Sequence, residues 1–60
     1  SPAEFLFQTR LKYAAKLLKS NGAVTQTCYR CGFKDSSHFS RSFKNFYGMT
    51  PTQYKQRHQN

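Results

Sequence analysis

The chain has 60 residues, which allows one small domain with a marginally stable core. Ten Lys and Arg residues against two Asp and Glu residues give a formal net charge of +8, which favours a polyanionic partner, either nucleic acid or an anionic membrane surface. No apolar run approaches the roughly 20 residues of a membrane span and no signal-peptide pattern opens the chain, so we expect a cytoplasmic protein with no membrane partner.

The first expected helix covers residues 1–20. It opens with the capping-box sequence Ser1-Pro2-Ala3-Glu4, and Asn21-Gly22 is its expected stop. At about 100° per residue the helix carries two apolar stripes, one of Phe7, Leu11, Ala14, Ala15 and Leu18 and the other of Leu6, Tyr13 and Leu17. A helix that is apolar on two sides requires two partners, so we expect the second stripe to be left for a missing domain or a second copy of the chain. The alternative is that the small domain wraps this helix more fully and covers the second stripe as well.

The second expected helix is short, from about Val24 to Cys31, and ends at Gly32. It contains Cys28 and Cys31 in the C-x2-C spacing of zinc and redox sites. A closed zinc site needs four ligands, and the two histidines of the chain do not stand in a zinc-finger spacing. Residues three apart share a helix face, so we expect both thiols to be core residues, with no metal and no cofactor; a small zinc module is the weaker alternative.

The third expected helix runs from Ser36 to about Tyr47, with Asp35 as its N-cap and Gly48 as its left-handed end. Phe39, Phe43 and Phe46 follow the i, i+4, i+7 pattern, and we expect all three to face the core. The opposite face carries Ser37, Arg41 and Lys44 near its centre, with His38, Ser40 and Asn45 beside them. Two short helices joined by a glycine turn predict a helix-turn-helix within an all-α, homeodomain-like bundle of one long and three shorter helices.

A helix with one aromatic face and one basic, polar face suits the major groove of DNA. Arg41 is the best candidate for a bidentate contact to guanine. We expect Ser37 and His38 to reach base edges or sugar, and Ser36, Ser40 and Lys44 to contact phosphates. Asn45 is a further candidate, although for His38 and Asn45 an ordinary solvated side chain is the favoured alternative.

The last expected helix opens with Thr50-Pro51-Thr52-Gln53, a second capping box, and runs through about Arg57. Both capping boxes share the form Ser/Thr-Pro-x-Glu/Gln-aromatic. Because the later copy closes a helix-turn-helix, the earlier copy is consistent with another one upstream.

The two acidic residues, Glu4 and Asp35, both fall where helices begin and are explained as caps. No carboxylate is then left for general acid or base work, and the chain has no glycine-rich phosphate loop. The sequence therefore argues against an enzyme.

The pattern GFxDxxHFSRxFK at residues 32–44, followed by YGxTPxxY at residues 47–54, resembles the C-terminal signature of the AraC/XylS family of bacterial transcription regulators. The resemblance extends upstream to Phe5-Leu6, Arg10-Leu11, Ala14 and Leu17-Leu18, which are similar to that family's linker helix. It implies that residues 1–20 are a linker helix and residues 24–57 the second of two helix-turn-helix subdomains, with the first subdomain absent. Residues 36–47 would then be the second recognition helix, with Ser37, His38 and Arg41 near bases and Ser36, Ser40 and Lys44 near the backbone.

The implied partners are double-stranded DNA, the upstream helix-turn-helix subdomain, a sensor domain and RNA polymerase. Thr27 and Cys28 depart from the family pattern, which usually has a branched apolar residue and an alanine at these positions. We expect these departures to affect packing more than DNA contact. The alternative function is a protein–protein interaction or dimerisation module that uses the apolar first helix.

Overall fold

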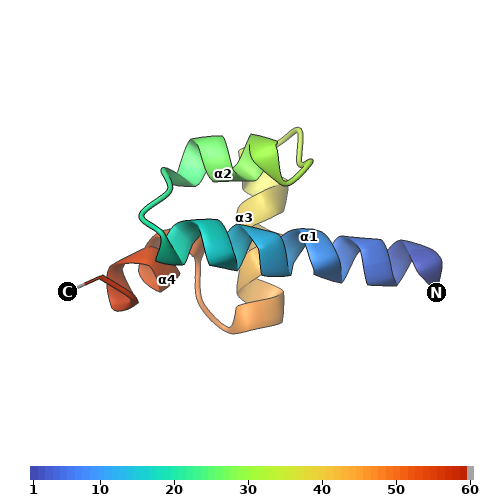
Figure 1. Ribbon diagram of the computed structural model, residues 1–60. Coiled ribbons are helices and arrows are strands. Elements are labelled where there is room, and N and C mark those ends of the chain that lie inside the picture. The colour runs from blue at the N-terminus through green and yellow to red at the C-terminus, as the bar shows by residue number, and fades with distance from the viewer. Residues whose placement is uncertain (60) are drawn as a thin grey trace.

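The computed structural model describes residues 1–59, which form four helices: α1 (Pro2–Lys19), α2 (Val24–Arg30), α3 (Ser36–Tyr47) and α4 (Pro51–Arg57). The helix α3 runs across α1, while α2 and α4 lie toward opposite ends of α3 (Figure 1). The expected all-α fold, with a long first helix and three shorter ones, is confirmed. Within residues 1–59, none of the helices combines the length and apolar character that a membrane crossing requires.

Helices α1 and α4 begin at the two predicted capping sequences. In α4 the capping box is complete, because the Thr50 hydroxyl accepts from the Gln53 N–H at 3.2 Å and the Gln53 side-chain oxygen accepts from the Thr50 N–H at 2.9 Å. In α1 the Ser1 hydroxyl accepts from the Glu4 N–H at 3.2 Å, and the Glu4 carboxylate lies 3.5 Å from the Ser1 amino nitrogen. These local interactions explain why the helix starts could be predicted from sequence.

Helix α1 ends at Lys19, just before the predicted stop at Asn21-Gly22, and these two residues have different backbone roles. Asn21 adopts the left-handed conformation, at φ 69°. Gly22 donates its N–H to the Leu17 carbonyl at 2.8 Å, and a Cβ on Gly22 would lie only 2.8 Å from that same oxygen. Glycine is therefore required at residue 22 by close approach of the backbone rather than by a positive φ.

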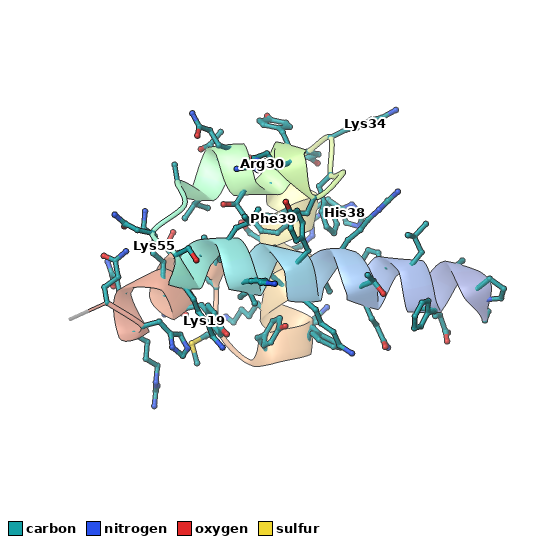
Figure 2. All side chains as sticks on the ribbon, viewed as in Figure 1. Lys19, Arg30, Lys34, His38, Phe39 and Lys55 are labelled. Atoms are coloured by element: carbon teal, nitrogen blue, oxygen red, sulfur yellow. The ribbon has the colours of Figure 1, made fainter. Side chains whose placement is uncertain are left out.

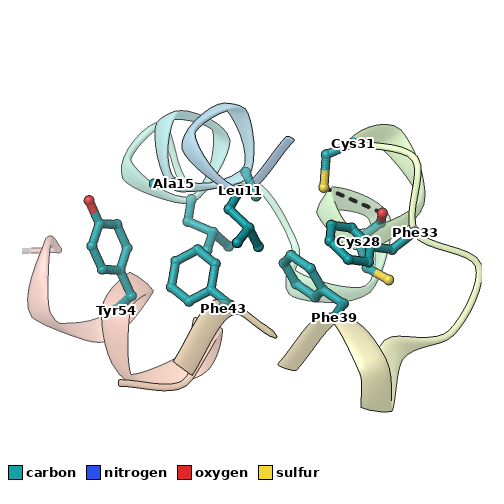
Figure 3. Close-up of a cluster of buried hydrophobic side chains, with 10 residues drawn as sticks. Leu11, Ala15, Cys28, Cys31, Phe33, Phe39, Phe43 and Tyr54 are labelled. Atoms are coloured by element: carbon teal, nitrogen blue, oxygen red, sulfur yellow. Dashed lines mark hydrogen bonds between the residues drawn. The ribbon is translucent and has the colours of Figure 1, made fainter. Parts of the chain in front are cut away.

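The hydrophobic core lies where α1 crosses α3. Phe39 points inward, whereas Lys34 extends away from the turn after α2 (Figure 2). Phe39 packs toward α2, with its ring centroid 5.2 Å from that of Phe33, and Phe43 packs toward α4, 5.3 Å from Tyr54 (Figure 3). The complete cluster comprises Leu11, Ala14, Ala15, Leu18, Cys28, Cys31, Phe33, Phe39, Phe43 and Tyr54. The first predicted stripe of α1 therefore faces the core, with Phe7 half-buried at its edge.

The prediction that Phe46 faces the core is wrong. Phe39 and Phe43 are fully buried, but the Phe46 side chain is 39% exposed. Tyr47 takes the inward position, with its ring centroid 4.7 Å from Phe43 and 5.2 Å from Tyr54. The cause is the return of α4, which covers the side of α3 that continues from Phe43 to Tyr47.

The second predicted stripe of α1 is largely uncovered. Leu6 is 51% exposed and Tyr13 is 42% exposed, while Leu17 is half-buried. The N-terminal part of α1 also extends beyond the other three helices (Figure 1). The alternative that the domain wraps this helix more fully is therefore wrong for Leu6 and Tyr13.

Both cysteines are buried in the core, as predicted. The Cys31 thiol donates to the carbonyl oxygen of Thr27 at 3.0 Å. It also approaches the carbonyl oxygen of Cys28, at 3.4 Å (Figure 3). Burial, reinforced by the neighbouring Cys28, raises the pKa of the Cys31 thiol to about 11. Among residues 1–59, no group of three or more His, Cys, Asp and Glu side chains is arranged to hold a metal ion. Thr27 is also fully enclosed, so the core accepts both departures from the family pattern.

Candidate nucleic-acid interface

Helices α2 and α3 form the helix-turn-helix, and their turn is shaped by Gly32. This residue has φ 97°, a conformation that residues with a Cβ rarely adopt. A Cβ at Gly32 would also lie 3.1 Å from Nε of Arg10, because the Arg10 side chain crosses the turn from α1. Phe33 then enters the core and fixes the turn beneath α3.

Both ends of α3 are fixed by local interactions. The Asp35 carboxylate accepts from the Ser37 N–H at 3.0 Å. Gly48 ends the helix in the left-handed conformation, at φ 80°, and donates its N–H to the Lys44 carbonyl at 2.7 Å. The three turns between these caps present a face whose orientation is set by the buried Phe39 and Phe43.

The predicted site residues lie mainly on the solvent-facing side of α3. Ser40 is half-buried, and the other six are exposed: Ser36, Ser37, His38, Arg41, Lys44 and Asn45. Within the described part of the chain, the one ion pair joins Ser1 and Glu4, so the Arg41 guanidinium has no carboxylate partner there. An exposed, unpaired guanidinium in the middle of this face is available for a ligand.

His38 and Asn45 do not lie with Arg41 at the centre of the face; they lie on the flank toward α1. The His38 ring centroid is 5.6 Å from that of Phe33 and 6.1 Å from that of Phe7. Asn45 lines a hollow of about 370 Å³ between α3 and the N-terminal half of α1, together with Phe7 and the exposed Phe46. The structure therefore brings Ser37, Arg41 and Lys44 together and places His38 and Asn45 beside a neighbouring helix.

Positive charge is spread around the domain rather than confined to α3. Lys34 extends from the turn before α3, and the labelled Lys19 and Lys55 lie toward the opposite end of the domain (Figure 2). The Lys19 ammonium lies 5.9 Å from the centre of the Tyr54 ring, within the range of a cation–π contact. Neither Arg10 nor Lys34 is among the DNA-contacting residues predicted from sequence. Lys34 could have been proposed from its position next to the capping Asp35. Nothing in the sequence indicates that Arg10 reaches the same turn.

Residues 1–57 match the family model described as a helix-turn-helix domain. The chain is 40% identical over 57 residues to the transcriptional activator RhaS of Escherichia coli, covering 93% of this chain and 20% of that protein. This chain belongs to the AraC family of helix-turn-helix DNA-binding domains. The resemblance predicted from the signature residues is thereby confirmed.

Two further relatives have similar identity to this AraC-type domain. An HTH-type transcriptional regulator of Haemophilus influenzae is 41% identical over 56 residues, covering 92% of this chain and 19% of the regulator. A protein of Formosa agariphila named histidine kinase P4 is 41% identical over 59 residues, covering 97% of this chain but 4% of the kinase. The chain thus spans a fifth or less of each of these three relatives, and no solved structure matches it significantly. The matching family is one of non-enzymatic regulators, even though one relative carries a kinase name.

Proposed function

We propose that this domain regulates bacterial transcription by sequence-specific DNA binding, with α3 lying in the major groove. In this account α2 holds α3 against the DNA backbone, as the first helix of a helix-turn-helix does. The observation that carries the proposal is the position of Arg41, which is exposed and unpaired directly opposite the buried Phe39 and Phe43.

The roles proposed for α3 follow from the position of each side chain. Arg41 contacts guanine through O6 and N7, because its planar guanidinium matches that pair of acceptors. Ser37 lies one turn earlier on the same face and contacts a base edge or sugar. Phosphate contacts are assigned to Ser36, Ser40 and Lys44, whereas His38 and Asn45 contact DNA from the flank near α1.

Selection from a pool of random duplexes tests this proposal. The 60-residue chain should enrich a short common sequence at low salt, and Arg41→Ala should remove the preference at one base position. Lys44→Ala should weaken binding to all sequences alike, because a phosphate contact carries no sequence information. Salt-sensitive binding with no enriched sequence would contradict base recognition.

We also propose that residues 1–20 are the linker helix and residues 24–57 the second helix-turn-helix subdomain of a longer regulator. The exposed Leu6 and Tyr13, together with the repeated capping sequence, support an upstream helix-turn-helix subdomain packed on α1. A sensor domain and RNA polymerase are the further partners proposed for the whole regulator, and the cytoplasm is its proposed location.

A second candidate function is protein–protein interaction or dimerisation through α1, which the same two exposed side chains favour. Sedimentation and a gel shift at low salt distinguish the two functions. The DNA-binding proposal expects a shifted duplex and no loss of affinity in Leu6→Ser. A dimer that Leu6→Ser dissociates, with no shift of any duplex, would support the alternative instead.

A further inference from the structure

The two flanks of the exposed face of α3 carry different groups. Successive residues are about 100° apart, so Ser40 and Lys44 fall on one side of Arg41, and His38 and Asn45 fall on the other. A helix is about 10–12 Å across and the major groove about 12 Å wide, so both flanks of a bound helix approach sugar-phosphate walls. Lys44 supplies a cation to one wall, but α3 itself offers none to the other.

A hollow lies beside His38 on the flank that lacks a cation. It has a volume of about 330 Å³ and is enclosed by α1 and the α2–α3 turn. Phe7 and Phe33 form its apolar wall, and Arg10, Lys34, Asp35 and His38 supply its polar groups. Arg10 and Lys34 bring two positive charges to the hollow from positions 24 residues apart in the sequence.

The exposed Arg10 side chain lies against the turn. A Cβ at Gly32 would lie 3.1 Å from Nε of Arg10 and 3.3 Å from its Cζ, so the guanidinium packs directly against the glycine backbone. The Arg10 guanidinium therefore places a positive charge beside the turn.

The other two charged residues that line the hollow are Lys34 and Asp35. Lys34 projects from the turn on a flexible stem and can swing toward a ligand (Figure 2). Asp35 is an acid at the rim, but its carboxylate accepts the Ser37 N–H and faces the positive end of α3. The hollow therefore keeps an excess of positive charge.

We propose that this hollow binds a backbone phosphate of the DNA wall next to His38, with Arg10 and Lys34 as its two cations. His38 donates a ring N–H to the same phosphate. The inference rests on the proposed function, because it assumes that α3 lies in the major groove. It adds a contact from α1 and the turn to those made by α3 itself.

The salt dependence of duplex binding tests this proposal with the 60-residue chain. Lys34→Ala and Arg10→Gln should each reduce the magnitude of the slope of log K against log salt concentration, and the double variant should reduce it by about 0.9, the value for one neutralised phosphate. Lys16→Ala is the matched control, because it removes the same charge from an exposed site on α1 outside the hollow. Its slope should equal that of the unmodified chain.

An unchanged slope in Lys34→Ala, equal to that of Lys16→Ala, would overturn the phosphate site while leaving DNA binding intact. Absence of binding by the unmodified chain would overturn the proposed function itself, and the phosphate site with it. Thermal unfolding identifies any loss of folding in Arg10→Gln. If that variant unfolds, Lys34→Ala decides the question alone, because Lys34 is exposed on a turn.

Discussion

The two faces of α3 differ in their side chains and in their burial. The inward face carries fully buried Phe39 and Phe43, and the outward face carries exposed Ser37, Arg41 and Lys44. Changes on the inward face should alter the free energy of unfolding, whereas changes on the outward face should alter DNA affinity. One short helix thus holds the fold together on one side and leaves the other side exposed for the proposed contact with DNA.

The largest expected effect comes from the inward face. Phe39→Ala removes a fully buried ring that packs against Phe33, and it should lower the free energy of unfolding by about 3–5 kcal/mol. In a domain this small, such a loss approaches the whole stability. Thermal unfolding followed by circular dichroism measures it, and a loss below about 1 kcal/mol would show that this face is not the core.

The thiol beneath the inward face should react slowly. With the pKa of Cys31 raised to about 11, its thiolate fraction at pH 8 is about a hundredfold lower than at an ordinary pKa near 9. Because the raised pKa belongs to the folded state, the stability it contributes is present below pH 9 and is lost as the pH rises through about 11.

Alkylation by iodoacetamide, followed by mass spectrometry, measures this reactivity in a Cys28→Ala background. Equal rates for the folded chain and for the chain in denaturant would contradict the burial of Cys31.

On the outward face, Arg41→Ala should weaken binding to the preferred duplex by about 1–3 kcal/mol. The free energy of unfolding should change by less than about 0.5 kcal/mol, because Arg41 is exposed and unpaired. Fluorescence anisotropy and thermal unfolding measure the two quantities in parallel. A large loss of stability would break the separation between the two faces.

The end of α3 offers a smaller test. Gly48 has φ 80° and nothing lies within 4 Å of where its Cβ would stand, so Gly48→Ala should cost about 1–2 kcal/mol through backbone strain alone. Gly48→Asn is the matched control and should cost less, because asparagine tolerates the left-handed conformation. Equal costs measured by denaturant unfolding would argue against strain as the cause.

The smallest expected effect is the cost of truncating Phe46, at the edge of the inward face. Phe46→Ala should cost clearly less than Phe43→Ala, because the Phe46 ring is 39% exposed and the Phe43 ring is fully buried. Denaturant unfolding of the two variants measures the difference. A cost for Phe46→Ala as large as that for Phe43→Ala would mean that the inward face extends to Phe46.

The helix boundaries could be predicted from sequence because local groups set them. Asp35, Thr50 and Gly48 act on backbone groups no more than four residues away. The choice of Tyr47 over Phe46 could not be predicted, since it depends on where α4 packs. The closeness of Arg10 to Gly32 also could not be predicted from sequence, because it depends on how α1 packs beside the turn. The predicted contacts of α3 with DNA remain predictions.

The most direct test of the central claim combines Arg41→Ala with a duplex in which 7-deazaguanine replaces the guanine selected by the chain. This base lacks the N7 acceptor in the major groove but still pairs normally. The unmodified chain should lose about 1.5–3 kcal/mol of binding free energy on the altered duplex, the range for a hydrogen bond to a charged group, whereas Arg41→Ala should lose almost nothing. Equal losses for both proteins would contradict a contact between Arg41 and guanine in the major groove.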